Sequence, residues 1–178
     1  MPITRIAAAV TGLACFALGV LTLTGPTVPD EHWGTRGAVV NGLGLLAFAA
    51  MALAVDLLRT QLDLRRLGRA GTGVARVGLV LMSVESIASE LHGGDTIGAV
   101  FMLGLLGSVV GLALIGIDGL RRRRLLAALP LLGLLVGIGA GDHGGFVVLG
   151  LVWSTLAATD RTGGAALSRS NISETTGV

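Results

Sequence analysis

Residues 96–117 read TIGAVFMLGLLGSVVGLALIGI, a run of 22 residues with no charged side chain. The hydrocarbon layer of a bilayer is ~30 Å thick, so a helix needs ~20 mostly apolar residues to cross it. Because backbone groups find no water in that layer, such a run satisfies its hydrogen bonds as an α-helix. This stretch therefore predicts a membrane-spanning helix.

Five further apolar stretches flank it, at about 6–24, 37–58, 73–91, 125–140 and 145–159. The chain is therefore predicted to be an all-α membrane protein, an antiparallel bundle of six transmembrane helices in one domain over residues 1–160. A Gly-, Ser- and Thr-rich flexible tail is expected over 161–178. The composition agrees, because 52% of the 178 residues are apolar and 13% are charged, against about 25% charged in soluble domains.

The first stretch has the basic and apolar regions of a secretory signal peptide but continues to Gly25 and Pro26 without a small-x-small cleavage site. We therefore expect it to be retained as a membrane span.

The basic residues predict the orientation in the membrane. All 13 are Arg, and 12 of them fall on one side of the predicted topology, with Arg36 alone on the other. Since arginines beside short loops stay in the cytoplasm, both termini are expected inside. The lysine-free, Gly/Ala/Arg-rich composition favours a bacterial inner membrane, with anionic lipids rather than nucleic acid as partners of the Arg121–Arg124 run. The absence of lysine also excludes Schiff-base chemistry and a Walker-A site.

Each predicted outer loop carries one histidine: His32, His92 and His143. Acidic residues accompany them, Asp142 among these. Neutral imidazoles and carboxylates are zinc ligands, so three converging loops would form a metal site from His32, His92, His143 and Asp142. The alternative is that these are three independent loop histidines, because no HxH or HxxxH spacing places two of them together.

Glu85 is the strongest single candidate for function. Glu85, Ser89 and His92 are spaced i, i+4, i+7 and so share one helix face. A carboxyl group inside a span is costly, by about 2.5–3.5 kcal/mol when charged, and must face a cavity or a partner or be protonated. Glu85 and His92 are therefore the candidate catalytic or proton-linked pair. The alternative is a structural carboxyl bonded through Ser83, Ser86 or Asn41.

Other polar and small residues are expected to be structural. Asp56 and Arg76 lie near the inner ends of adjacent spans and should form an ion pair, and Trp153 should pack in the core. Two glycine ridges, Gly104/Gly107/Gly111 and Gly133/Gly137/Gly141, should allow close helix approach or form a homo-oligomer face.

The last hairpin is short, with only 35 residues from Leu125 to Thr159 and with Pro130 interrupting its first helix early. Asp142 and His143 are therefore expected below the outer surface, in a vestibule beside Glu85. Local thinning of the bilayer is the alternative.

The chain also shows a weak internal repeat. The triplet GLL begins twelve residues after His32 and again after His92, at Gly44 and Gly104. Three pseudo-repeated hairpins are a pattern known in transporters.

Residues 77–107, VGLVLMSVESIASELHGGDTIGAVFMLGLLG, resemble a family of bacterial six-helix integral membrane proteins called domain of unknown function 998. His92 stands at the position of that family's histidine. The resemblance implies this architecture over most of the chain and no particular activity.

Three functions remain open at this point. The favoured one is a small structural or accessory membrane protein without chemistry of its own. The second is a proton- or ion-linked binder or carrier of a small molecule that uses Glu85. The third is an outer-leaflet enzyme acting on a lipid or isoprenoid, with Glu85 as acid and histidines as base or zinc ligands.

Overall fold

The computed structural model describes residues 2–24, 35–91, 98–121 and 124–159. Their regular structure is helical throughout, which confirms the all-α prediction. The elements are α1 (Pro2–Leu23), α2 (Thr35–Gln61), α3 (Arg66–Leu91), α4 (Gly98–Leu120), the 3-10 helix η1 (Leu125–Ala128), α5 (Leu129–Gly139), the 3-10 helix η2 (Gly141–His143) and α6 (Gly145–Ala158).

Four of these helices, α1 to α4, are long and apolar enough to cross a membrane. Many of their large apolar side chains are exposed on the outside of the molecule, such as Leu13, Leu53, Val77 and Leu103. Soluble monomers rarely expose so much apolar surface in one patch, so these outer faces suit lipid. The helix formed by η1 and α5 and the helix α6 are also apolar but shorter, at roughly 21–24 Å each.

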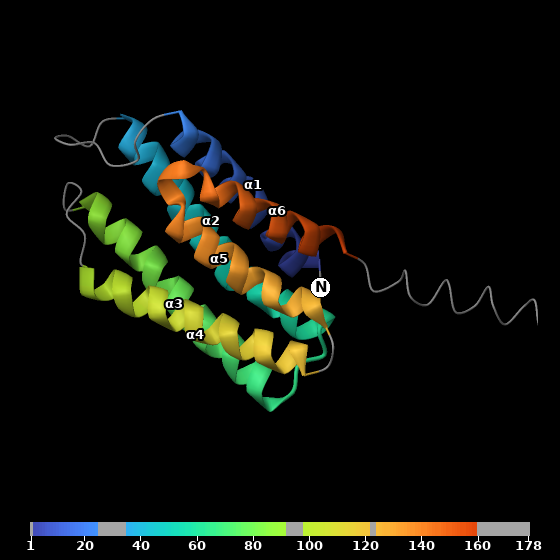
Figure 1. The fold of residues 1–178 in the computed structure, drawn as a ribbon. Coiled ribbons are helices and arrows are strands. Elements are labelled where there is room, and N and C mark those ends of the chain that lie inside the picture. The colour runs from blue at the N-terminus through green and yellow to red at the C-terminus, as the bar shows by residue number, and fades with distance from the viewer. Residues whose placement is uncertain (1, 25–34, 92–97, 122–123, 160–178) are drawn as a thin grey trace, which may run out of the picture.

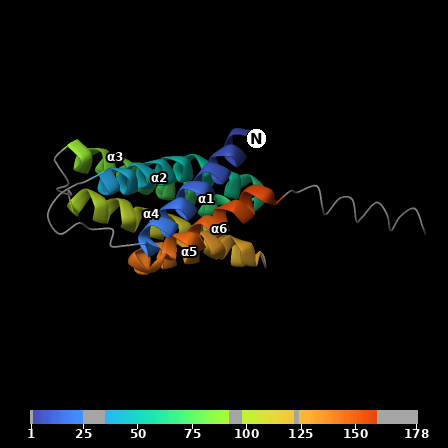
Figure 2. The ribbon, with the colours of Figure 1, turned by 90° about the horizontal axis from the view of Figure 1, so that it is seen from above.

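The helices form a closed ring. Each α-helix contacts the next one along the chain, and α6 returns to contact α1. Figure 1 shows them running back and forth, and Figure 2 shows α2 and α3 on one side, α5 and α6 on the other, and α1 crossing between them. The connections α2–α3 and α4–η1 lie at one end of the ring, and η2 lies at the opposite end, hereafter the η2 end.

Between the Glu85 region and the end that holds the α2–α3 and α4–η1 connections, the interior of the ring is filled by apolar side chains. Met51, Leu79, Leu112, Leu134 and Trp153 are fully buried and belong to one continuous core cluster. Trp153 is therefore a core residue, as its place in the sequence predicts.

Glycines bring neighbouring helices close together. A Cβ at Gly104 would stand 2.8 Å from Met82 Cγ and 2.9 Å from Gly78 O, and one at Gly111 would overlap the backbone of Ala75. Gly133 and Gly137 pack in the same way against Leu149 of α6. Both predicted glycine ridges thus serve close packing within the chain.

Two helix starts differ in detail from the sequence pattern. Helix α3 begins at Arg66, ahead of the apolar stretch that starts near residue 73, because arginine is compatible with a helix outside lipid. Pro130 lies in the first turn of α5 and does not interrupt a helix, since η1 precedes it. A first-turn proline loses no hydrogen bond, because its missing N–H would have had no intrahelical partner.

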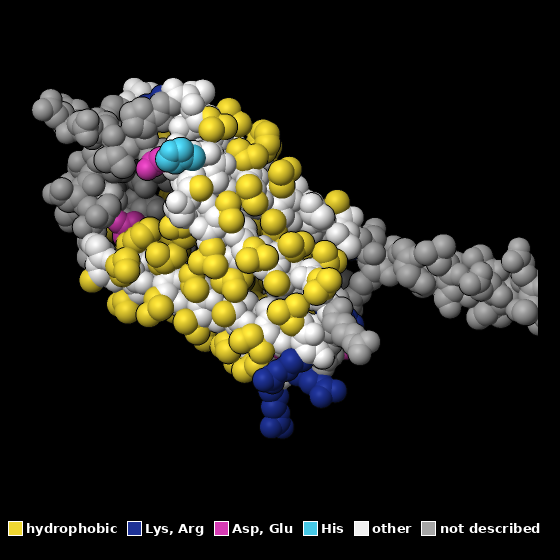
Figure 3. Space-filling model, in the orientation of Figure 1, with side chains coloured by type: hydrophobic (Ala, Val, Ile, Leu, Met, Phe, Trp, Pro, Cys, Tyr) yellow, Lys and Arg dark blue, Asp and Glu magenta, His cyan; other side chains and the backbone are white. Residues whose placement is uncertain are grey.

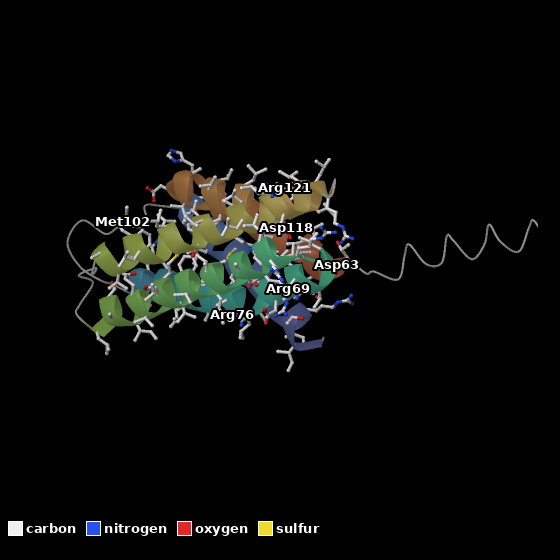
Figure 4. The ribbon with its side chains drawn as sticks, turned by 90° about the horizontal axis from the view of Figure 1, so that it is seen from below. Asp63, Arg69, Arg76, Met102, Asp118 and Arg121 are labelled. Carbon is white, nitrogen blue, oxygen red and sulfur yellow. The ribbon has the colours of Figure 1, made fainter. Side chains whose placement is uncertain are left out.

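Charge is divided between the two ends of the ring. Arg59, Arg65, Arg69, Arg121 and Arg124 lie at the end that holds the α2–α3 and α4–η1 connections, hereafter the arginine end. In Figure 3 the arginine side chains of the visible face gather mainly there, hydrophobic ones cover the middle, and the opposite end carries acidic side chains and histidine. Figure 4 places Asp63, Arg69, Asp118 and Arg121 at this same end and Met102 at the other.

One ion pair joins α2 to α3 between the two ends. Arg76 Nη2 contacts Asp56 Oδ2, and Arg76 Nε donates a hydrogen bond to Ala52 O at 3.1 Å. This confirms the pairing of Asp56 with Arg76 expected from the sequence.

Candidate functional site: a buried carboxyl in a cavity

Glu85 lies on α3 with only 5% of its surface exposed. Its Oε1 atom is fully buried and has no hydrogen-bond partner among the described residues. A buried oxygen acceptor without a donor is unfavourable, by about 1–3 kcal/mol. Water or a ligand could supply the donor that the described residues do not.

The polar side chains next to Glu85 donate hydrogen bonds to backbone carbonyls. The Ser83 hydroxyl donates to Leu79 O at 2.9 Å and the Ser86 hydroxyl to Met82 O at 3.1 Å. A hydroxyl has a single proton to donate, so neither serine donates to Glu85 while these bonds hold. Asn41 Nδ2 donates to Ser86 O at 2.8 Å and ties α2 to α3 beside the carboxyl group.

Glu85 faces a cavity of about 260 Å³ between the helices, hereafter the Glu85 cavity. Every α-helix of the ring, together with η2, contributes to its wall. Its lining residues are Leu18, Thr22, Val40, Asn41, Gly44, Phe48, Met82, Glu85, Ser86, Phe101, Ile138, Gly141, Asp142 and Phe146.

The wall is apolar and aromatic with a few polar groups. Phe48, Phe101 and Phe146 are three of the four phenylalanines in the chain, and they come from three different helices. Its described lining residues include the carboxyl groups of Glu85 and Asp142 and no basic side chain. The Thr22 hydroxyl bonds to Gly19 O at 2.8 Å, as is usual for a threonine inside a helix. This combination is typical of a small-molecule site, in which apolar walls surround a few placed polar groups.

The cavity is closed toward the arginine end and lies near the surface at the η2 end. Beyond its lining, the helices continue toward the arginine end with fully buried apolar side chains: Met51, Leu79, Leu112, Leu134, Leu149 and Trp153. At the other end Asp142 is both part of the lining and exposed. Among the described residues, the cavity therefore reaches the surface at the η2 end and ends at the apolar core.

The backbone of η2 is shaped by a glycine. Gly144 has φ of +77°, a left-handed conformation, and caps the start of α6. A Cβ there would also stand 2.8 Å from the side chain of Leu23. Gly144 thus allows the short turn that brings Asp142 to the cavity.

The structure brings together some of the predicted site residues. Glu85 and Asp142 line one cavity, as expected from the short last hairpin, whereas His143 is exposed on η2 and outside the lining. His32 and His92 fall outside the described residues, so the convergence of the three histidines stays a prediction. Within the described part of the chain no group of three His, Cys, Asp or Glu residues is placed to hold a metal ion.

The three phenylalanines of the wall are functional candidates that the sequence pattern does not single out. Each lies in an apolar run where a core residue is the usual interpretation. The one sequence feature that could have drawn attention to them is that the chain contains only four phenylalanines.

No protein family, curated protein or solved structure matches this chain. The resemblance to the domain of unknown function 998 family therefore remains a prediction.

Proposed function

We propose that this chain is a multi-pass membrane protein that binds a small organic amine in the Glu85 cavity. The observation that carries the proposal is the unpartnered, buried Glu85 Oε1 inside a cavity with aromatic walls. This develops the binder or carrier hypothesis of the sequence analysis. We place it ahead of the accessory role, because that role does not account for a buried carboxyl oxygen that lacks a donor among the described residues.

The chemistry of the wall favours an amine over other ligands. An ammonium group donates hydrogen bonds to a carboxylate, and hydrogen bonds that involve charged groups are worth about 1.5–3 kcal/mol. Phenylalanine faces attract cations as well. Because the lining has two carboxyl groups and no basic side chain, an anion would be repelled. A volume of about 260 Å³ corresponds to roughly nine water molecules, which suits a compact arylalkyl amine.

We further propose that all six α-helices cross a bacterial inner membrane, with the arginine end and both termini in the cytoplasm. The division of charge between the two ends of the ring supports this orientation. The shorter pair, η1–α5 and α6, would be accommodated by local thinning of the bilayer and by snorkelling of Arg124. The Glu85 cavity would then open to the outside of the cell.

The enzyme hypothesis needs a second reactive group beside Glu85. The sequence nominates His92, as a base or a zinc ligand, and His92 lies outside the described residues. No observation of the described residues favours catalysis over binding.

A pair of isosteric probes tests the proposal. The purified protein in detergent is titrated with 2-phenylethylamine and with propylbenzene, which has the same shape but no ammonium group. We expect the amine to bind about 10- to 100-fold more tightly than the hydrocarbon, because only the amine donates to Glu85. Equal affinity for the two probes would contradict the proposal.

Variants assign the effect to Glu85. Glu85→Gln should lower amine affinity to that of propylbenzene and leave propylbenzene binding unchanged, which also shows that the cavity is intact. Ser83→Ala is the matched control, since Ser83 is buried on the same helix but outside the lining. Asp142→Asn should have a smaller effect than Glu85→Gln, because Asp142 is exposed to water.

A further inference from the structure

A second cavity, of about 480 Å³, lies at the arginine end and is separate from the Glu85 cavity. It is lined by Arg65, Asp118, Arg121 and Arg124. These residues come from the α2–α3 turn, the last turns of α4 and the residue before η1. Figure 4 shows Asp118 and Arg121 together at this end of the molecule.

Two of the lining residues are held by hydrogen bonds. Asp118 is 6% exposed, and its Oδ2 accepts a hydrogen bond from the backbone N–H of Arg65 at 2.8 Å. A Cβ at Gly68 would stand 2.7 Å from the same Oδ2, so the carboxylate packs tightly against the first turn of α3. Arg124 Nη1 donates to Gln61 O at 2.9 Å, which anchors this guanidinium to the end of α2.

The remaining two guanidinium groups are not paired with any described residue. Neither Arg65 nor Arg121 has a side-chain hydrogen bond or ion pair within the described part of the chain. Asp118 contributes one negative charge against three arginines, and no ion pair joins it to them among those residues. Three guanidinium groups around one cavity repel each other, although water screens this repulsion because Arg65 and Arg121 are exposed. An anion between them would offset it further, and guanidinium is well shaped to bind phosphate oxygens in pairs.

The surface beside this cavity is apolar. Leu125 and Leu126, the first residues of η1, are 75% and 49% exposed, and Leu120 at the end of α4 is 46% exposed. A charged cavity bordered by exposed leucines matches a molecule with a phosphate head and a hydrocarbon tail. We propose that the Arg65–Arg121–Arg124 cavity binds the phosphate group of an anionic membrane lipid, with the acyl chains along Leu120 and Leu125.

Native mass spectrometry of the full chain in detergent tests this inference. Phosphatidylglycerol and phosphatidylcholine are added separately, and inorganic phosphate is added as a competitor. We expect phosphatidylglycerol to bind in preference to phosphatidylcholine, and inorganic phosphate to displace it only weakly. Full displacement by inorganic phosphate at matched concentration would overturn the lipid assignment and indicate a site for a soluble anion.

Arginine variants locate the site. Arg65→Gln and Arg121→Gln should each lower phosphatidylglycerol affinity about five-fold, whereas Arg59→Gln should leave it unchanged, because Arg59 is exposed nearby but outside the lining. Arg121→Lys should recover part of the loss, since it keeps the charge but not the paired donors. An equal loss in Arg59→Gln would overturn the inference and show diffuse surface attraction. Unchanged melting temperatures without lipid will confirm that the variants fold.

Discussion

At the scale of single residues, Glu85 Oε1 is one of two fully buried side-chain polar atoms that have no hydrogen-bond partner among the described residues; the other is Trp153 Nε1. The Ser83 and Ser86 hydroxyls and Asn41 Nδ2 nearby donate to backbone carbonyls, Asn41 to Ser86 O. A fully structural carboxyl would be expected to recruit one of these donors instead. The carboxyl oxygen left over inside an aromatic cavity is thus better explained by a ligand than by packing.

The Asp56–Arg76 pair gives a prediction about stability at the same scale. The two side chains are 41% and 43% exposed. Because water screens a partly exposed ion pair, we expect a coupling energy of about 1 kcal/mol. Asp56→Asn, Arg76→Gln and the double variant form a double-mutant cycle, read out by the free energy of unfolding in a denaturing detergent. A coupling energy of zero would show that the two side chains act independently.

At the scale of helices, close contact between α3 and α4 depends on glycine. Gly111→Ala should lower the free energy of unfolding by about 1–3 kcal/mol, because its methyl group would overlap the backbone of Ala75. Gly73→Ala is the matched control on α3: nothing lies within 4 Å of its Cβ position, and alanine favours a helix by up to ~1 kcal/mol over glycine. If the two variants lose equal stability, the glycine contact is not what holds α3 to α4.

The sequence predicts the helices better than it predicts what they enclose. Long apolar runs define the spans, and the placement of Asp56 and Arg76 at neighbouring helix ends predicts their pairing. The convergence of Phe48, Phe101 and Phe146 depends on how each helix is rotated about its axis. Leucine, glycine and valine occur all around these helices, so no polar face reveals that rotation.

The hydrogen bond from the Arg65 N–H, just before α3, to Asp118 could not be predicted from the sequence either. The bond joins residues 53 positions apart, and no local pattern links them. That contact brings Arg65 beside Asp118 in the wall of the arginine-lined cavity, whereas the sequence alone indicates only an arginine run near anionic lipids.

At the scale of the whole molecule, the closed ring separates two chemistries along one axis. An acidic, aromatic cavity lies toward the η2 end, an arginine-lined cavity lies at the other end, and a filled apolar core stands between them. This core gives no continuous path through the ring in this conformation. This arrangement favours the proposed binder over a carrier, since transport would require a second conformation that opens the core.

We propose above that an amine occupies the Glu85 cavity and that this cavity opens to the outside of the cell. The most direct test is labelling of a single cysteine at the cavity wall, Asp142→Cys, in a Cys15→Ala background in intact cells. Cys15 is buried in α1, and Arg121→Cys at the arginine end serves as the control for sidedness.

We predict that a membrane-impermeant maleimide labels the cysteine at position 142 and not the one at position 121. Saturating 2-phenylethylamine should slow labelling at position 142. Labelling of position 121 instead, or a rate at position 142 that the amine leaves unchanged, would contradict the account.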